Sequence, residues 1–323
     1  MSFSSDVKGE LARIENSKKC CMLAEIAGFL RVSSSIRLAG GGKLGIVATT
    51  ETNATARHYW KLLKEYFKSN AELAVGDSQM PGSRKYRNRY YLNISPEEKS
   101  MQILRETGMM LIREGDDYFS DGIYQPVVRS KCCKKSYLRG MFLSCGTMSD
   151  PNKSYHLEFV LDKEQTANDL KKLIGSFVDL SANITKRGDK YIVYIKKQEY
   201  IRDILSLMGA DDAVLEFENI RILKSSAART RKAMNFEEAN GNKSLMAAEE
   251  QKHWLQKIAE SECGRKATKE DLADPGSTFW TEGLRHLPPQ LKEVAYIRLY
   301  KPYADLREIG ETISPPIGKP AVS

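Results

Sequence analysis

Apolar and small side chains follow the same order twice along this chain. A helical run from Cys20 through Gly28 returns from Cys132 through Gly140, 112 residues later. After each run the apolar period changes from helical to strand-like and back. The copies share a strand at 44–50 or 155–161, a helix at 56–67 or 167–177, a strand at 86–94 or 191–195, and a short helix ending in glycine at 101–108 or 201–209. The pattern predicts a duplicated unit.

Each copy reads helix, strands, helix, strands, helix, which predicts an α+β fold with helices on one face of an antiparallel sheet. We expect two αββαββα repeats to pack about a pseudo-two-fold axis. The first copy has about ten more residues than the second, and we place them in a loop at 76–89. The expected parts are an N-terminal helix at 1–17, a duplicated domain at 18–215 (repeats about 18–110 and 130–212), a basic linker at 216–243 and an all-α domain at 244–323.

Gly28 and Gly140 lie in the middle of the two matching helices. A glycine inside a helix costs about 1 kcal/mol relative to alanine. A close crossing of the two helices would offset this cost, because backbones can approach where side chains are absent. The repeats are therefore predicted to join through these two glycines.

Charge and hydropathy narrow the class of protein. The net charge is +8 at a pI near 9.0, which favours a polyanionic partner if the basic residues cluster. The N-terminus has the pattern of an amphipathic helix and not of a signal peptide, and no apolar run reaches the ~20 residues that a membrane-spanning helix needs. We expect a cytoplasmic protein with no membrane association.

Six cysteines occur as two adjacent pairs, Cys20-Cys21 and Cys132-Cys133, with Cys145 and Cys263 alone. Zinc sites usually space their ligands two to four residues apart and recruit further cysteine or histidine. The four scattered histidines do not supply that pattern, so reduced, buried thiols at helix starts are expected instead of a metal site. We predict no metal and no cofactor.

The segment from Leu138 to Gly146 resembles the LAGLIDADG helix of homing endonucleases, and 26–34 is a weaker match. In those nucleases the eighth motif position is acidic, and the two copies place two carboxylates together to hold Mg²⁺. Phosphodiester cleavage needs such anionic oxygen ligands. Ser33 and Cys145 stand at these positions here. The resemblance therefore implies the nuclease fold without its catalytic acids.

Further segments resemble the WhiA family of bacterial sporulation and cell-division transcription regulators almost from end to end. They are 2–13, 18–21, 134–146, 150–158, 217–222 and 238–244. The resemblance implies a catalytically inactive LAGLIDADG domain followed by a sigma-factor-like helix-turn-helix domain. It also implies action at promoters on double-stranded DNA, with a partner regulator or RNA polymerase as an additional partner.

The last 80 residues carry the helix-turn-helix expectation. Pro288-Pro289 opens one helix, and Asp305 with Glu308 forms a capping pattern for a short second one. In the family this second helix positions a recognition helix, of which 318–323 contains only the beginning, and Lys319 is its one remaining candidate contact. The stretch 263–283 is expected to be a flexible loop.

In the nucleases resembled here, the sheet face opposite the helices forms a saddle over DNA. We therefore take basic residues on that face and in the linker as phosphate-binding candidates, with ordinary solvated surface as the alternative. The candidates are Arg84, Lys85, Arg87, Arg89, Lys190, Lys196, Arg229, Arg231, Lys232 and Lys319. The leading hypothesis is a DNA-binding transcription regulator that is not an enzyme. The alternatives are an interaction scaffold that recruits another regulator and, last, a residual Mg²⁺-dependent nuclease.

Overall fold

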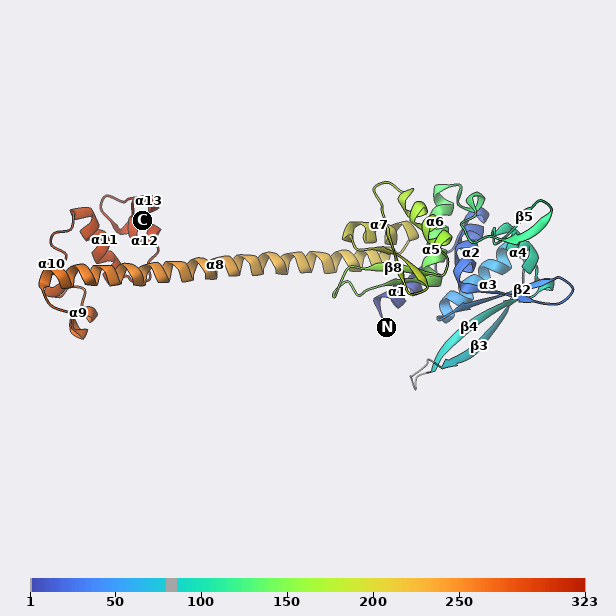
Figure 1. Ribbon diagram of the computed structural model, residues 1–323, viewed down its shortest axis with the longest axis horizontal. Helices are drawn as coiled ribbons and strands as arrows, with labels where there is room; N and C mark the ends of the chain where they lie inside the picture. Colours follow the sequence, from blue (N-terminus) through green and yellow to red (C-terminus); the bar gives the residue numbers. More distant parts are fainter. Residues whose placement is uncertain (1, 80–85, 323) are drawn as a thin grey trace. The chain divides into compact units, whose positions relative to one another are not determined.

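The structure is a computed structural model that describes residues 2–79 and 86–322. The chain divides into two compact units, residues 1–223 and 224–323 (Figure 1). Each unit has its own hydrophobic core. They are described separately below.

Unit 1 contains the two predicted repeats, each with the element order αββαββα. The first repeat consists of α2 (Lys19–Ser33), β1 (Ser34–Leu38), β2 (Leu44–Thr50), α3 (Asn53–Phe67), β3 (Glu72–Gln79), β4 (Tyr86–Ile94) and α4 (Ser100–Glu106). The second consists of α5 (Lys131–Cys145), β7 (Gly146–Met148), β8 (Leu157–Leu161), α6 (Glu164–Gly175), β9 (Asn183–Arg187), β10 (Lys190–Ile195) and α7 (Gln198–Met208). The predicted duplication and fold class are confirmed.

The two sheets have equivalent topologies. Their strand orders are β1-β2-β4-β3 and β7-β8-β10-β9, with antiparallel neighbours. Because side chains alternate along a strand, Leu92 and Ile94 of β4 enter the core while Arg89, Tyr91 and Asn93 lie on the opposite face. This opposite face of each sheet is called the outer face below.

Between the repeats lie a small hairpin and two short 3-10 helices. The hairpin is β5 (Met110–Arg113) with β6 (Asp116–Phe119), and the 3-10 helices are η1 (Pro96–Glu98) and η2 (Gln125–Val128).

The extra residues of the first repeat extend a hairpin, so the predicted loop at 76–89 is wrong. Strands β3 and β4 stay paired from Glu72 with Asn93 to Gln79 with Tyr86. The equivalent strands of the second repeat pair only as far as Arg187 with Lys190. A continued antiparallel ladder satisfies the backbone hydrogen bonds that a loop would leave to water. The insertion therefore lengthens one arm of the outer face.

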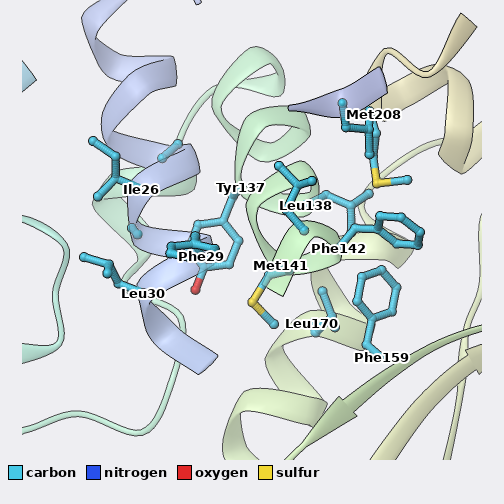
Figure 2. Packing of buried hydrophobic residues seen from close by; sticks show 14 of the residues in the cluster. Ile26, Phe29, Leu30, Tyr137, Leu138, Met141, Phe142, Phe159, Leu170 and Met208 are labelled. Carbon is cyan, nitrogen blue, oxygen red and sulfur yellow. The ribbon is translucent and has the colours of Figure 1, made fainter. Parts of the chain in front are cut away.

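Helices α2 and α5 cross at the two predicted glycines. A Cβ atom added at Gly28 would lie less than 3.0 Å from backbone of Tyr137, and one added at Gly140 less than 3.0 Å from backbone of Glu25. Real Cβ atoms do not approach so closely, so only glycine allows this backbone contact. Figure 2 shows the apolar side chains packed around the crossing, among them Ile26, Phe29, Leu30, Tyr137, Leu138, Met141 and Phe142.

A buried polar network also joins the two helices. Glu25, fully buried on α2, accepts hydrogen bonds from Arg139 of α5 (Nε to Oε2 2.9 Å, Nη2 to Oε2 2.7 Å) and lies 2.7 Å from His58 Nε2 through its other oxygen. Asn16 Nδ2 donates to the same carboxylate at 2.6 Å. Arg139 Nη1 donates to the carbonyl of Met208 at 2.9 Å. The network therefore joins three helices and the segment before α2.

The N-terminal helix α1 (Phe3–Leu11) packs against unit 1, with Phe3, Val7 and Leu11 buried. It is shorter than the helix predicted over 1–17. Both carboxylate oxygens of Glu10 accept backbone N–H groups at the start of α8 (Asp211–Cys263), from Asp212 at 2.8 Å and Ala213 at 3.0 Å. A carboxylate is favourable there because helix N-termini carry unpaired N–H groups and positive dipole.

The expected linker at 216–243 lies within α8 and is helical throughout. Its basic residues keep their exposure, but the helix places them on one side. At 3.6 residues per turn, Lys224, Arg229, Arg231 and Lys232 fall within an arc of about 160°. The helix thereby converts a basic stretch of sequence into a basic face.

Unit 2 packs short helices around the C-terminal part of α8. They are α9 (Lys269–Ala273), α10 (Thr278–Gly283), α11 (Pro289–Tyr300), α12 (Leu306–Thr312) and α13 (Lys319–Val322). The expected helix start at Pro289 and the Asp305 cap of α12 are confirmed, since the Asp305 carboxylate accepts the N–H groups of Arg307 and Glu308.

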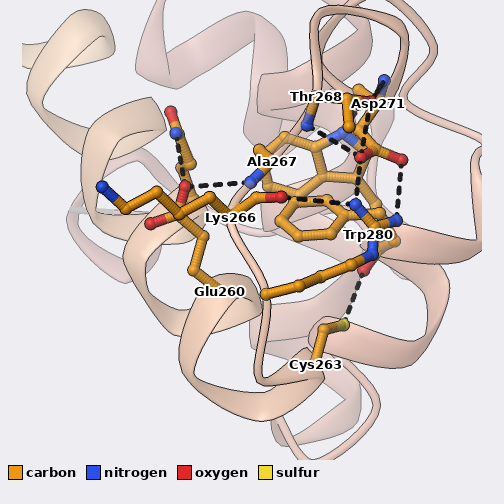
Figure 3. A network of polar contacts seen from close by, with 10 residues as sticks. Glu260, Cys263, Lys266, Ala267, Thr268, Asp271 and Trp280 are labelled. Atoms are coloured by element: carbon orange, nitrogen blue, oxygen red, sulfur yellow. Dashed lines mark hydrogen bonds and ion pairs between the residues drawn. The ribbon is translucent and has the colours of Figure 1, made fainter.

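The expectation of a flexible loop at 263–283 is wrong. Trp280 is fully buried, and its Nε1 donates to the carbonyl of Asp271 at 2.7 Å (Figure 3). Thr268 caps α9 in a capping box with Asp271, whose carboxylate also pairs with Arg265 Nη1 at 2.6 Å. Phe279 and Trp280 thus anchor a segment whose polar composition suggested a loop.

Candidate nucleic-acid interface

The helix ends where the motif would place catalytic acids carry Ser33 and Cys145. Helix α2 ends at Ser33 and α5 at Cys145. The Ser33 hydroxyl donates to the carbonyl of Phe29 at 2.7 Å, and the Cys145 thiol donates to the carbonyl of Met141 at 3.4 Å. Both side chains therefore bond back to their own helix and offer no anionic oxygen to a cation.

A cavity of about 580 Å³ lies at these helix ends. Its lining includes Ser33 and Cys145 together with three charged residues, Lys8, Glu51 and Arg89. Lys8 comes from α1, and Arg89 from the outer face of β4. Two cations against one carboxylate favour an anion at this place over Mg²⁺.

Burial keeps the two titratable groups nearest the motif position out of metal chemistry. It raises the pKa of the Cys145 thiol to about 12, so the thiol is neutral at pH 7. It also lowers the pKa of the half-buried Lys8 ammonium, an effect opposed by the charges of Cys145 and Glu51. Within residues 2–79 and 86–322, no group of three or more acidic, histidine or cysteine side chains that could hold a metal includes either motif position.

The outer face of the first sheet presents basic and aromatic residues together. Arg89 is exposed, and Tyr91 and Asn93 follow it on the same face of β4. Arg37 of β1 is exposed on this face too, because β1 and β4 both pair with β2 in the register that places Arg37 beside Gly45 and Tyr91 beside Thr49. The arrangement can contact a phosphate backbone through guanidinium groups and stack on planar groups.

The second sheet is less basic. Lys190 Nζ forms an ion pair with Asp162, which offsets its charge. Lys196 follows β10, and its Nζ lies 5.3 Å from the ring centroid of Tyr194. His156 and Glu158 form a further pair on this sheet. Of the two candidates here, Lys196 has the better access to an external anion.

The remaining candidates differ in how far the structure describes them. Arg84 and Lys85 lie outside the described residues. Arg87 lies in β4 and Lys319 in α13, but their side chains are not among those described. Arg229, Arg231 and Lys232 are exposed on α8 in unit 2.

Sequence reasoning did not identify Arg37 or Lys8. Arg37 is preceded by Ser34, Ser35 and Ile36, and this short run gave little strand signal. Lys8 belongs to the predicted N-terminal helix, and only the packing of α1 places it beside Cys145. For Arg37, the strand alternation of a hairpin that turns at 39–43 could have found it.

Comparisons with known proteins agree with this description. Three family models match: the WhiA N-terminal LAGLIDADG-like domain at 19–110, the WhiA LAGLIDADG-like domain at 134–227, and the WhiA C-terminal HTH domain at 230–323. A "Probable cell division protein WhiA" from Alkaliphilus metalliredigens is 37% identical over 100% of this chain and 94% of its own length. The protein of that name from Clostridium beijerinckii is 36% identical over 100% and 95%.

The chain also resembles a solved structure over its whole length. Full-length DUF199/WhiA from Thermatoga maritima matches with a TM-score of 0.57 and 21% identity, covering 100% of this chain and 94% of that one. At this identity the match supports the fold. Among the residues described, no helix is long and apolar enough to cross a membrane.

Proposed function

The chain belongs to the WhiA family, and on this premise we propose that it is a DNA-binding transcription regulator of cell division and sporulation. In this proposal the duplicated domain clamps DNA through its outer faces, and the helix-turn-helix domain of unit 2 reads the promoter. A partner regulator or RNA polymerase would act at the same promoter. DNA as the partner would place the protein at the nucleoid.

The observation that carries the proposal is the contrast within unit 1. The repeat architecture and the glycine crossing of the homing-endonuclease fold remain, while Ser33 and Cys145 replace the acids. The interface is thus preserved without the chemistry, which favours binding over cleavage. The basic residues at the outer face and in the cavity, Arg37, Arg89 and Lys8, support contact with phosphate.

Charge reversal on the outer face should weaken DNA binding. With Arg37→Glu and Arg89→Glu combined, we expect the slope of log K against log salt to shrink by about 2, since each lost phosphate contact removes about 0.9. Gel-shift titrations of a duplex at several salt concentrations measure both quantities.

The matched control reverses two cations on the helical side of the same sheet. Arg57 and Lys61 are exposed on α3, so Arg57→Glu with Lys61→Glu changes the net charge equally. We expect this control to bind nearly as the natural protein does. Equal loss in both double variants would remove the outer face from the proposal. A complete lack of DNA retention by the natural protein at low salt would favour the interaction scaffold.

The proposal also predicts the absence of nuclease activity. Supercoiled plasmid incubated with the full chain and Mg²⁺ should remain uncut, because the motif positions offer a hydroxyl and a neutral thiol beside the Lys8 ammonium. An active homing endonuclease with its own target plasmid serves as the positive control. Mg²⁺-dependent nicking that increases with protein concentration and elutes with the chain would contradict this prediction.

A further inference from the structure

The two cysteine pairs meet at one end of the α2–α5 crossing. The Sγ atoms of Cys20, Cys21, Cys132 and Cys133 all lie within 4.8 Å of one another. Each pair occupies the first turn of its helix, α2 or α5. The pseudo-two-fold symmetry therefore brings together two pairs that are 112 residues apart in the sequence.

We propose that these four thiols form a structural Zn²⁺ site that fastens the two repeats together. Four sulfur ligands are the donor set of closed tetrahedral zinc sites, with Zn–S bonds of about 2.3 Å. A tetrahedron with such bonds has S–S edges of about 3.8 Å. Sulfur atoms already within 4.8 Å need only a small contraction to reach it.

Electrostatics at the cluster favour deprotonated sulfur. Both helix N-termini direct their unpaired N–H groups and the positive end of the dipole toward it. The net charge of a Zn²⁺ tetrathiolate is −2, and the nearby lysines are placed to offset it. These are Lys18, Lys19, Lys131, Lys134 and Lys135.

A hydroxyl supports the sulfur atoms from outside the cluster. Ser130, the N-cap of α5, donates to Cys133 Sγ at 2.9 Å and lies 3.1 Å from Cys132 Sγ. Such groups orient the ligands of metal sites. Cys20 is exposed and Cys132 partly exposed, which gives an ion an entry path, while Cys21 and Cys133 are buried. Four protein ligands leave no open coordination position, so the site is structural and not catalytic.

The site is separate from the degenerate catalytic position. Cys20 and Ser33 lie at opposite ends of α2, which at 1.5 Å per residue puts them about 20 Å apart. The sequence analysis considered each pair alone and predicted no metal site. Only the packing of α2 on α5 supplies the other two ligands.

Cobalt provides the direct test, because Co²⁺ enters tetrahedral thiolate sites and reports them by absorption. The full chain, purified reduced and stripped with a chelator, is titrated with Co²⁺. We expect thiolate-to-cobalt charge transfer in the near ultraviolet and tetrahedral ligand-field bands in the red, saturating at one equivalent per chain. Added Zn²⁺ should remove both.

The variants identify the ligands. Cys20→Ser with Cys132→Ser alters the two more accessible thiols and should lower the affinity for Co²⁺ at least 100-fold, whereas Ser130→Ala should lower it about tenfold. Cys145→Ser with Cys263→Ser removes equally many thiols away from the cluster and should bind as the natural protein does. Circular dichroism verifies that each variant is folded.

Several results would overturn the proposal. They are cobalt spectra without thiolate bands, equal binding by the Cys20→Ser/Cys132→Ser variant, or stable disulfides between the pairs in reduced, chelator-free preparations. A rise in melting temperature on adding Zn²⁺, absent from that variant, would support it independently of DNA binding.

Discussion

Gly140→Val is expected to destabilise unit 1 by about 3 kcal/mol or more, a large part of the stability of an ordinary domain. A Cβ atom at this position would lie less than 3.0 Å from the backbone of Glu25 and Phe29. The obstacle is backbone and not the end of a flexible side chain, so the two helices would have to separate. Gly28→Val should act the same way against Tyr137. Denaturant-dependent hydrogen exchange in peptides from α2 and α5 measures the loss in unit 1 itself.

Gly9→Ala is the control for this prediction. Gly9 lies in α1, and a Cβ atom there would meet nothing within 4 Å. The substitution should stabilise that helix by up to about 1 kcal/mol. If Gly140→Val proved as stable as Gly9→Ala, the close approach of α2 and α5 would be wrong.

Glu25→Ala should cost about 3–5 kcal/mol, because it leaves Arg139 and His58 buried without their carboxylate. Urea unfolding followed by exchange in α5 measures the change. The control is Glu15→Ala, which breaks the exposed pair of Glu15 with Lys61 and should change stability little. A small effect of Glu25→Ala would mean that the network adds nothing to the repeat interface.

The same carboxylate predicts a pH dependence. Burial would raise the pKa of Glu25, but the His58 hydrogen bond and the Arg139 charge outweigh it, and the pKa lies below its ordinary value of 4.5. The unfolded chain then binds more protons than the folded one in acid. Stability from this group is therefore present above pH 4.5 and declines as the pH falls toward the folded pKa. In Glu25→Gln, this part of the acid destabilisation should disappear from the unfolding midpoints.

The repeat architecture was predictable because it is written in local periodicity. The apolar stripes of α3 and α6 and the alternation of β4 depend only on neighbouring residues. The two glycines were also readable, since a costly residue at the middle of both helices implied a close contact. The family motif fixed Ser33 and Cys145 as the positions to inspect.

What the sequence did not show depends on contacts between distant segments. The four thiols meet only when α2 packs on α5, and Lys8 reaches Cys145 only when α1 packs on unit 1. The stretch 263–283 looked like a loop because its polar residues outnumber Phe279 and Trp280, yet those two side chains are buried deeply enough to order it. Local composition underestimates a segment whose few apolar residues are large.

The cavity at the ends of α2 and α5 bears on the evolutionary history of this fold. Two point mutations could restore acids at positions 33 and 145, but each would face the ammonium of Lys8 or the guanidinium of Arg89. An acid placed there would form an ion pair with these cations before it could hold a divalent ion. The loss of cleavage is thus entrenched: a return to the ancestral chemistry requires changes in α1 and β4 as well as at the motif.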